Sequence, residues 1–327
     1  MSKTKLTLIL ALGVLLVVCL KFVKVGGSDL SADPVNTPPV EGLDLSSFSQ
    51  DAPPHPLNLV FLHHSCGGQL LADPGSDEGS IPGSAIYASH PCGGGLRSAL
   101  VDQGYSVHEA SYGSSLGEHT DLFDWLPKFR DRMPDVLSCA GQDSELEGES
   151  SNAIVVFKSC FPNNKFVGPG QDPGDANGKQ LTVANAKATL RALLPEFEKH
   201  PGVLFVYVTA PPMAPKTAAR NLFRVLKDTL RGKASPESRR LTGSLLAREF
   251  NDWVSNREGW LADYPAKNVV VFNYYQVLTA DGASNLSRFC APNGLDSHPN
   301  REGNAKAATE FTEFLNRAVH RSGLIQD

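Results

Sequence analysis

Short apolar runs alternate with longer amphipathic segments along most of this 327-residue chain. The runs are four to six residues long and, apart from the more polar segment at 105–110, consist mainly of β-branched, leucine and aromatic residues, as buried strands do. They lie at residues 57–62, 105–110, 153–157, 203–208 and 269–272. Helical patterns fill the intervals, at residues 96–103, 121–130, 183–200, 217–231, 237–256 and 301–319. Strands that alternate with helices predict one α/β domain, at about residues 57–322, whose parallel sheet carries helices on both faces.

Three local signals refine this pattern. Thr182 is a predicted N-cap for the helix at 183–200, and Pro195 is expected to bend or break that helix because proline lacks an N–H. Residues 67–94 are rich in Gly, Pro and Ser and predict a long loop. Residues 139–151 are polar and acidic and predict a surface loop.

The N-terminus has the pattern of a targeting segment. Lysines precede and follow an apolar run at residues 6–20, as in a secretory signal peptide or an uncleaved signal-anchor, with residues 1–27 as its extent. Val18 is too large to precede a lipidated Cys19, so lipidation is disfavoured. Both remaining interpretations place the domain outside the cytoplasm, whether secreted, periplasmic or membrane-anchored. Residues 28–56, rich in Pro, Ser and Gly, predict a linker.

The composition narrows the classes of function. The formal charge is −5 and the pI about 6.0, with no extended basic stretch, so no nucleic-acid partner is expected. The sequence contains no glycine-rich phosphate-binding motif and no zinc-like cysteine spacing, so we expect neither a cofactor nor a metal. Five cysteines follow the N-terminal segment, at positions 66, 92, 139, 160 and 290. An extracytoplasmic domain permits disulfides, but the sequence leaves their pairing open.

Candidate chemistry begins where the first apolar run ends. Ser65 follows His63 and His64 and lies just before a pair of glycines. A strand that stops at a serine in a tight turn presents a hydroxyl at the carboxyl edge of the sheet, where open α/β sheets bind ligands. A helix cap is the alternative role for a lone serine. A nucleophile also needs a base, and His298 is the best candidate in the chain.

Two motifs resemble those of the SGNH/GDSL hydrolase superfamily, the flavodoxin-like esterases and O-acyl hydrolases. The first is similar to a branch that has His-His-Ser-x-Gly in place of Gly-Asp-Ser, and here it reads His63-His64-Ser65-Cys66-Gly67. The second is the block before the last helix, Asp296-Ser297-His298-Pro299. The resemblance covers roughly residues 57–320 and is specific at its two ends. It implies a single flavodoxin-like three-layer α/β/α domain whose strand order 2-1-3-4-5 brings both motifs to one edge of the sheet.

The resemblance implies a role for each residue of the two motifs. Ser65 would attack an ester carbonyl, His298 would take and return the proton, and Asp296 would hold the imidazole. The common block is Asp-x-x-His, whereas Asp296 lies two residues before His298. Residues two apart project to the same side of an extended segment, and Pro299 favours extended geometry at His298. The alternative role for Asp296 is a turn cap at the start of the last helix.

The resemblance also implies three oxyanion donors: the nucleophile's own N–H, a glycine after the second strand and an asparagine after the third. Gly113 matches the glycine position, although a plain turn glycine is the alternative. Asn163 and Asn164 are the candidates after the third strand, but they lie further along than the pattern, so Lys158 or Ser159 could serve instead. Loss of one such donor typically costs about 100- to 1000-fold in rate.

The neighbours of Ser65 are expected to have structural roles. A histidine of the pair should brace the Ser65 turn, and Cys66 should be a buried thiol or part of a disulfide. The sequence therefore predicts an extracytoplasmic serine esterase that acts on small-molecule or carbohydrate O-acyl esters, with membrane contact through the N-terminal segment. Two alternatives stay open: an O-acetyltransferase that uses the same acyl-enzyme, and a non-catalytic surface or carbohydrate-binding protein on the same fold.

Overall fold

The computed structural model describes residues 40–79, 81–216 and 234–325 of the chain. The predicted signal or anchor segment and the predicted helix at 217–231 lie outside these residues. In the described part of the chain, no helix is both long enough and apolar enough to cross a membrane.

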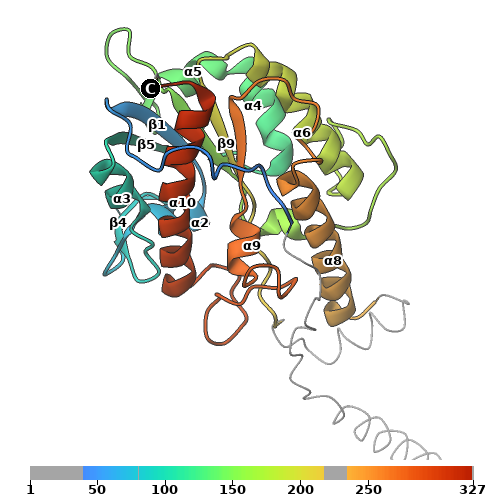
Figure 1. Ribbon diagram of the computed structural model, residues 1–327. Helices are drawn as coiled ribbons and strands as arrows, with labels where there is room; N and C mark the ends of the chain where they lie inside the picture. The colour runs from blue at the N-terminus through green and yellow to red at the C-terminus, as the bar shows by residue number, and fades with distance from the viewer. Residues whose placement is uncertain (1–39, 80, 217–233, 326–327) are drawn as a thin grey trace, which may run out of the picture. The chain divides into compact units, whose positions relative to one another are not determined.

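A parallel sheet of five strands forms the centre of the domain (Figure 1). The strands lie in the order β5-β1-β8-β9-β10, which is the predicted order 2-1-3-4-5. The prediction of an α/β fold is confirmed, and the apolar runs located every strand of this sheet to within one residue at each end. The strands are β1 (Leu57–Leu62), β5 (Tyr105–Ala110), β8 (Ile154–Lys158), β9 (Leu204–Val208) and β10 (Val269–Phe272).

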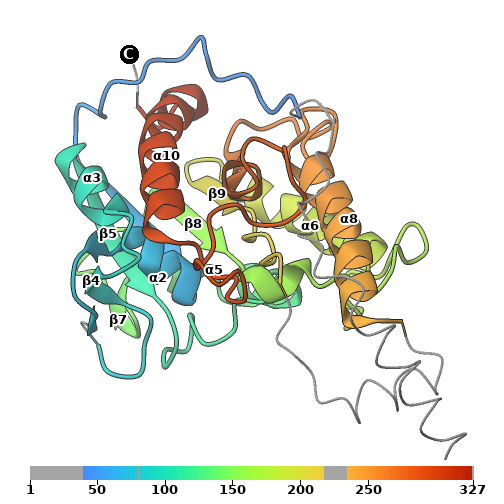
Figure 2. The ribbon, with the colours of Figure 1, turned by 90° about the horizontal axis from the view of Figure 1, so that it is seen from below.

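Successive side chains of the strands enter two different cores, because alternate residues of a strand face opposite sides of the sheet. In β1, Val60 and Leu62 join one apolar cluster, and Leu59 and Phe61 join the other. Helices α4, α5, α6 and α8 pack on the first cluster, and α2, α3, α9 and α10 pack on the second (Figure 2). The helix bounds are α2 (Ser65–Leu71), α3 (Leu96–Asp102), α4 (Trp125–Asp131), α5 (Met133–Ser138), α6 (Val183–Glu198), α8 (Pro236–Ser255), α9 (Tyr274–Leu278) and α10 (Arg301–Ser322).

Helix α6 begins as predicted but is not broken by its proline. The Thr182 hydroxyl accepts a hydrogen bond from the backbone N–H of Asn185 at 3.3 Å, which caps the helix. Pro195 lies inside α6, which continues to Glu198. Proline removes one intrahelical hydrogen bond, and burial of the apolar face that includes Phe197 offsets this loss. The possibility that Pro195 breaks the helix was therefore wrong.

The prediction of one long loop at 67–94 was also wrong. Helix α2 continues to Leu71, and a small sheet follows in the order β2-β4-β3. Gly68 is a poor helix former by propensity, but a Cβ at this position would lie 1.7 Å from the Ala85 carbonyl oxygen. Tertiary packing therefore requires glycine here and overrides the local preference. The short strands are β2 (Asp73–Pro74), β3 (Glu78–Gly79) and β4 (Tyr87–His90), and a hairpin of β6 (Cys139–Gly141) and β7 (Ser144–Glu145) lies in the acidic loop.

Part of the predicted linker packs against α10. Leu45 is buried in the cluster that covers this face of the sheet. The Arg317 guanidinium donates to the carbonyl oxygens of Leu45, Ser46 and Phe48 at 2.9 to 3.1 Å. Packed structure therefore extends upstream of residue 57, and the boundaries of the signal or anchor segment stay a prediction.

Candidate active site

Ser65 lies where β1 gives way to α2, at the carboxyl edge of the sheet. His64 has the extended conformation of an N-cap residue, and Ser65 is the first residue of the helix. Two glycines allow the turn to pack closely: a Cβ on Gly67 would lie 2.4 Å from the Cβ of His63, and Gly68 faces Ala85 as described above. The close packing of this turn fixes the position of the Ser65 hydroxyl.

The structure brings Ser65, His298 and Asp296 together. The Ser65 Oγ lies 2.9 Å from His298 Nε2, although the two residues are 233 positions apart in the chain. His298 Nδ1 lies 2.7 Å from Asp296 Oδ1, and the His298 backbone N–H donates to the same oxygen at 3.0 Å. With its proton on Nδ1 toward the carboxylate, the imidazole presents Nε2 as an acceptor for the serine hydroxyl.

Asp296 is more exposed than the histidine it holds. Its side chain is 54% exposed, against 27% for His298. Partial burial alone would raise the pKa of Asp296, but hydrogen bonds from the backbone and ring of His298 outweigh this effect and lower it. The carboxylate is therefore charged at neutral pH.

Backbone and side-chain contacts hold the segment that carries His298 in place. Cys290 and Pro299 form an isolated β-bridge, and the Ser297 Oγ accepts a hydrogen bond from the backbone N–H of Ala214 at 2.9 Å. Asn300 caps α10, since its side chain accepts from the backbone N–H of Gly303 at 2.9 Å. Asn300 thus has the turn-capping role that was the alternative for Asp296.

His63 braces the Ser65 turn through a buried ionic group. Its Nε2 lies 3.0 Å from Glu109 Oε2, and the other oxygen of Glu109 accepts from Arg97 Nε at 2.7 Å. His63 is fully buried and Glu109 nearly so. Burial would raise the pKa of Glu109, but the hydrogen bond and charge of His63 and the charge of Arg97 lower it. This group connects the end of β1 to β5 and α3.

Gly113, Asn163 and Asn164, the candidate oxyanion donors besides the N–H of Ser65, have other partners in this structure. The backbone N–H of Gly113 donates to the Glu118 carboxylate at 2.8 Å. The Asn163 amide donates to Asp121 at 2.8 Å, and the Asn164 amide donates to two backbone carbonyl oxygens at 2.9 Å. The structure therefore uses both asparagines to fix the loop after β8.

Tyr112, the residue before Gly113, is a site residue that the sequence did not reveal. Burial raises the pKa of its phenol, while the proximity of Ser65 acts in the opposite direction. The Tyr112 ring stacks on His64 with centroids 3.8 Å apart. His64 Nε2 in turn lies 2.8 Å from the Gly117 carbonyl oxygen. Tyr112 thus stacks on His64 and lies close to Ser65.

The loop after β8 places a buried thiol beside the nucleophile. Cys160 Sγ lies 3.9 Å from Ser65 Oγ. Burial raises the pKa of the Cys66 thiol, whereas a hydrogen bond from Cys66 and the charge of Lys158 lower the pKa of Cys160. All five cysteines of the described chain are free thiols. Phe161, the next residue, meets the His298 ring edge-on with centroids 5.0 Å apart.

The comparisons with known proteins give structural likeness only. No protein-family model matches the chain, and no curated protein matches its sequence. The strand order of the chain is the one that the resemblance to the SGNH/GDSL hydrolases implies.

Solved structures with this likeness include three proteins of low identity. One is a carbohydrate esterase family 2 enzyme of Corynascus thermopiles (Myceliophthora fergusii), with 14% identity, TM-score 0.35, and 82% of this chain and 67% of that chain covered. A variant of an acetyl xylan esterase of Geobacillus stearothermophilus has 11% identity, TM-score 0.39, and 85% and 100% coverage. A GDSL-like lipase of Parabacteroides merdae has 15% identity, TM-score 0.36, and 82% and 96% coverage.

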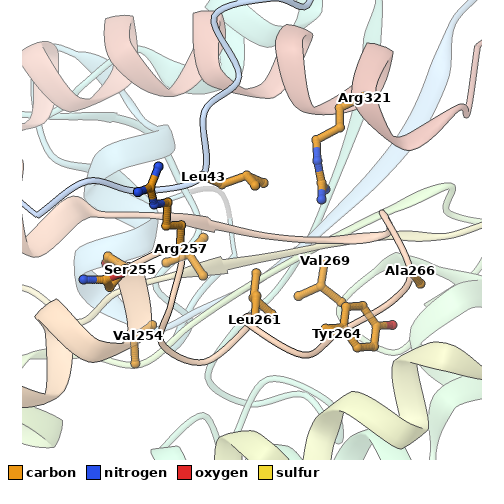
Figure 3. Close-up of a pocket in the computed structure, with 11 residues that line it drawn as sticks. Leu43, Val254, Ser255, Arg257, Leu261, Tyr264, Ala266, Val269 and Arg321 are labelled. Atoms are coloured by element: carbon orange, nitrogen blue, oxygen red, sulfur yellow. The ribbon is translucent and has the colours of Figure 1, made fainter.

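The described residues also form a small pocket that is separate from this site. A pocket of about 50 Å³ lies at the start of β10, where Leu43 and Arg321 approach Val269 (Figure 3). It is at the opposite end of the parallel strands from Ser65 and is large enough only for a few water molecules. No group of three or more His, Cys, Asp or Glu side chains among residues 40–79, 81–216 and 234–325 could hold a metal ion.

Proposed function

We propose that the protein is an extracytoplasmic serine esterase that hydrolyses O-acyl esters, with acetylated carbohydrate as its substrate class. The observation that carries the proposal is the 2.9 Å contact between Ser65 Oγ and His298 Nε2, with Asp296 on the other ring nitrogen. A nucleophile, a base and an orienting carboxylate in this order are the parts that acyl transfer needs. The lysine-flanked apolar run at residues 6–20 supports a location outside the cytoplasm.

The reaction would proceed in two stages. Ser65 Oγ bonds to the ester carbonyl carbon as its proton passes to His298 Nε2, and the carbonyl oxygen becomes an oxyanion. The intermediate collapses, the alcohol leaves with the proton from Nε2, and the acyl group stays on Ser65. Water then attacks the acyl-enzyme, gives a proton to Nε2, and its hydroxyl leaves as part of the carboxylic acid while Ser65 regains a proton. Asp296 stabilises the imidazolium in both stages.

Tyr112 would stabilise the oxyanion together with the backbone N–H of Ser65. Tyr112 lies close to Ser65, whereas the N–H of Gly113 donates to Glu118. Cys160 Sγ is close to Ser65, but a thiol is only a weak hydrogen-bond donor. The phenol of Tyr112 is the stronger donor and takes the place expected for the glycine.

Ser65→Ala tests the esterase directly. The purified protein should hydrolyse p-nitrophenyl acetate, and the substitution should reduce that rate to the level without enzyme. Equal rates in the two proteins, or none in either, would refute the esterase. Adding a sugar acceptor separates the O-acetyltransferase alternative, because a transferase would form acetylated sugar faster than free acetate.

Tyr112→Phe tests the oxyanion role. The substitution keeps the ring on His64 and removes one donor, so kcat should fall by about 100-fold while KM changes little. Tyr264→Phe is the matched control, because that hydroxyl is also hydrogen-bonded, to Asn268 at 2.7 Å, but lies near the start of β10. A kcat within a factor of about three of the wild type for Tyr112→Phe would leave the oxyanion to other donors.

A further inference from the structure

A cavity of about 710 Å³ lies beside the segment that carries His298. Four parts of the chain form it: residues 164–167 after β8, residues 213–216 after β9, the first turns of α8, and residues 295 and 297. Its volume falls in the range of roughly 300 to 1000 Å³ that small-ligand sites occupy. The cavity is therefore large enough for a sugar unit.

The charged side chains that line this cavity are all positive. Lys165, Lys216, Arg239 and Arg240 line it, and no aspartate or glutamate of the described residues does. Glu237 acts electrostatically on Arg240 but is not part of the lining. Because the whole chain carries a formal charge of −5, four cations at one cavity are a local reversal of sign.

Hydrogen bonds to the backbone hold the cationic wall of the cavity, the part with Lys216 and Arg240, in place. Arg240 donates to the Ala214 carbonyl oxygen at 2.7 Å, and the Ala214 N–H donates to Ser297 Oγ. The Lys216 N–H donates to the Gly294 carbonyl oxygen at 2.8 Å, which joins the end of the 213–216 segment to the loop before His298. The cationic wall is thus tied to the segment that carries the catalytic histidine.

The segment 295–298 lies between the cavity and Ser65. Leu295 and Ser297 line the cavity, and they alternate along the chain with Asp296 and His298, of which His298 contacts Ser65 and Asp296 contacts His298. At the rim, the Lys165 ammonium lies 5.7 Å from the centre of the Phe161 ring, which meets His298 edge-on. A polymeric substrate whose ester is at Ser65 would reach this cavity by passing over the rim at Phe161 and Lys165.

We propose that the cavity binds an anionic group of the carbohydrate ester, a carboxylate or sulfate on a sugar unit next to the acylated one. This inference rests on the proposed function and names the substrate class: acidic, not neutral, acylated polysaccharide. Lysine and arginine bind oxyanions through charge-assisted hydrogen bonds, and the apolar residues of the lining, such as Leu295, suit the face of a sugar ring.

Binding to the full-length Ser65→Ala protein tests the cavity without turnover. Calorimetry would compare three probes: oligogalacturonide, a sulfated oligosaccharide and neutral xylo-oligosaccharide. We expect one of the acidic probes to bind at least about tenfold more tightly than the neutral one, with an affinity that falls as salt rises. Which acidic probe binds distinguishes a carboxylate from a sulfate. Equal affinity for all three, or no binding, would overturn the proposal.

Variants locate the binding to this cavity. Lys165→Gln combined with Lys216→Gln should weaken binding of the acidic probe by about tenfold, because each exposed charged contact is worth a factor of a few. Lys199→Gln is the matched control, since Lys199 is an exposed lysine at the end of α6 and should leave the affinity unchanged. The same loss in both proteins would assign the effect to overall charge and refute the site.

Turnover separates this inference from the proposed function. With acetylated forms of the same probes, the wild type should show a higher kcat/KM for the acidic ester, and the double variant should lower the ratio of acidic to neutral kcat/KM about tenfold. Ser65-dependent hydrolysis without any preference would overturn the anionic site alone. If the acidic probe still binds but no ester is hydrolysed, the proposed esterase activity is refuted and the anionic site is retained.

Discussion

Asp296→Asn isolates the charge of the proposed third member of the triad. Asp296 Oδ1 accepts both from the ring Nδ1 of His298 and from its backbone N–H. Asparagine offers a carbonyl oxygen in the same place, so both hydrogen bonds can persist and the tautomer of the imidazole need not change. The substitution therefore removes mainly the attraction between the carboxylate and the imidazolium that forms during the reaction.

The size of that attraction follows from distance and exposure. At the observed 2.7 Å, Coulomb's law gives about 1.5 kcal/mol in water and about 6 kcal/mol at an effective dielectric of about 20. Asp296 is 54% exposed, which favours the lower half of this range. We take about 2 to 3 kcal/mol, which corresponds to a fall in kcat of about 30- to 150-fold. The same change costs about 10⁴-fold in a serine-protease triad, where it leaves the histidine in the wrong tautomer.

The assay is the steady-state rate of p-nitrophenyl acetate hydrolysis on the alkaline plateau. The His298 contacts hold the Asp296 pKa below its ordinary value of 3.8, so the carboxylate is charged throughout the neutral range and its effect is lost only as the pH falls through that lowered value. Asp281→Asn is the control, an exposed aspartate paired with Lys306. A kcat within about threefold of the wild type would remove Asp296 from the mechanism, and a loss above about 10⁴-fold would refute the argument from exposure.

Two predictions concern the packing behind the nucleophile. Glu109→Gln leaves Arg97 and His63 without their carboxylate and should lower the free energy of unfolding by about 3 kcal/mol in urea titrations at neutral pH. Because the Glu109 pKa is lowered in the fold, its stabilisation is complete above the ordinary value of 4.5 and is lost as the pH falls through the folded pKa, so the difference between the two proteins should shrink there. A difference that stays constant down to about pH 3 would contradict this. Gly68→Ala should lower the free energy of unfolding by about 1 to 3 kcal/mol or more, since its Cβ would meet the Ala85 carbonyl oxygen, whereas Gly79→Ala meets no atom within 4 Å and should be neutral in the same titration.

The sheet could be predicted from the sequence because β1, β8, β9 and β10 are largely apolar runs, whereas β5, which contains His108 and Glu109, was placed by its position between a helix that ends at a glycine and the next helical pattern. Strands buried on both faces need no polar positions, so their runs stand out and end where burial ends. The short strands β2 and β3 have only two residues each, all exposed, and leave no such signal. Helix α2 was hidden for a different reason: its second glycine is explained by contact with Ala85, which is remote in the chain.

Ser65 and His298, which come from the two ends of the domain sequence, could be predicted. The hydrogen-bond donors that come from the sequence between them could not. Ser65 and His298 follow strand ends, so the topology alone brings them to one edge of the sheet. Hydrogen-bond partners near them depend on side-chain placement: Glu118 takes the N–H of Gly113, and the adjacent Tyr112 faces Ser65. A tyrosine beside a candidate glycine is the one signal that could have pointed to it, and it is a weak one.

The short spacing between Asp296 and His298 has a structural consequence. Because one carboxylate oxygen binds both the ring and the backbone of a residue two positions away, the orientation of the imidazole is set within a single tripeptide. Ser297, at the centre of that tripeptide, is held by Ala214, which also accepts from the cavity residue Arg240. The contacts that would bind an anionic sugar and those that orient the base therefore share one short segment. Occupation of the cavity would reinforce the geometry on which the Ser65–His298 contact depends.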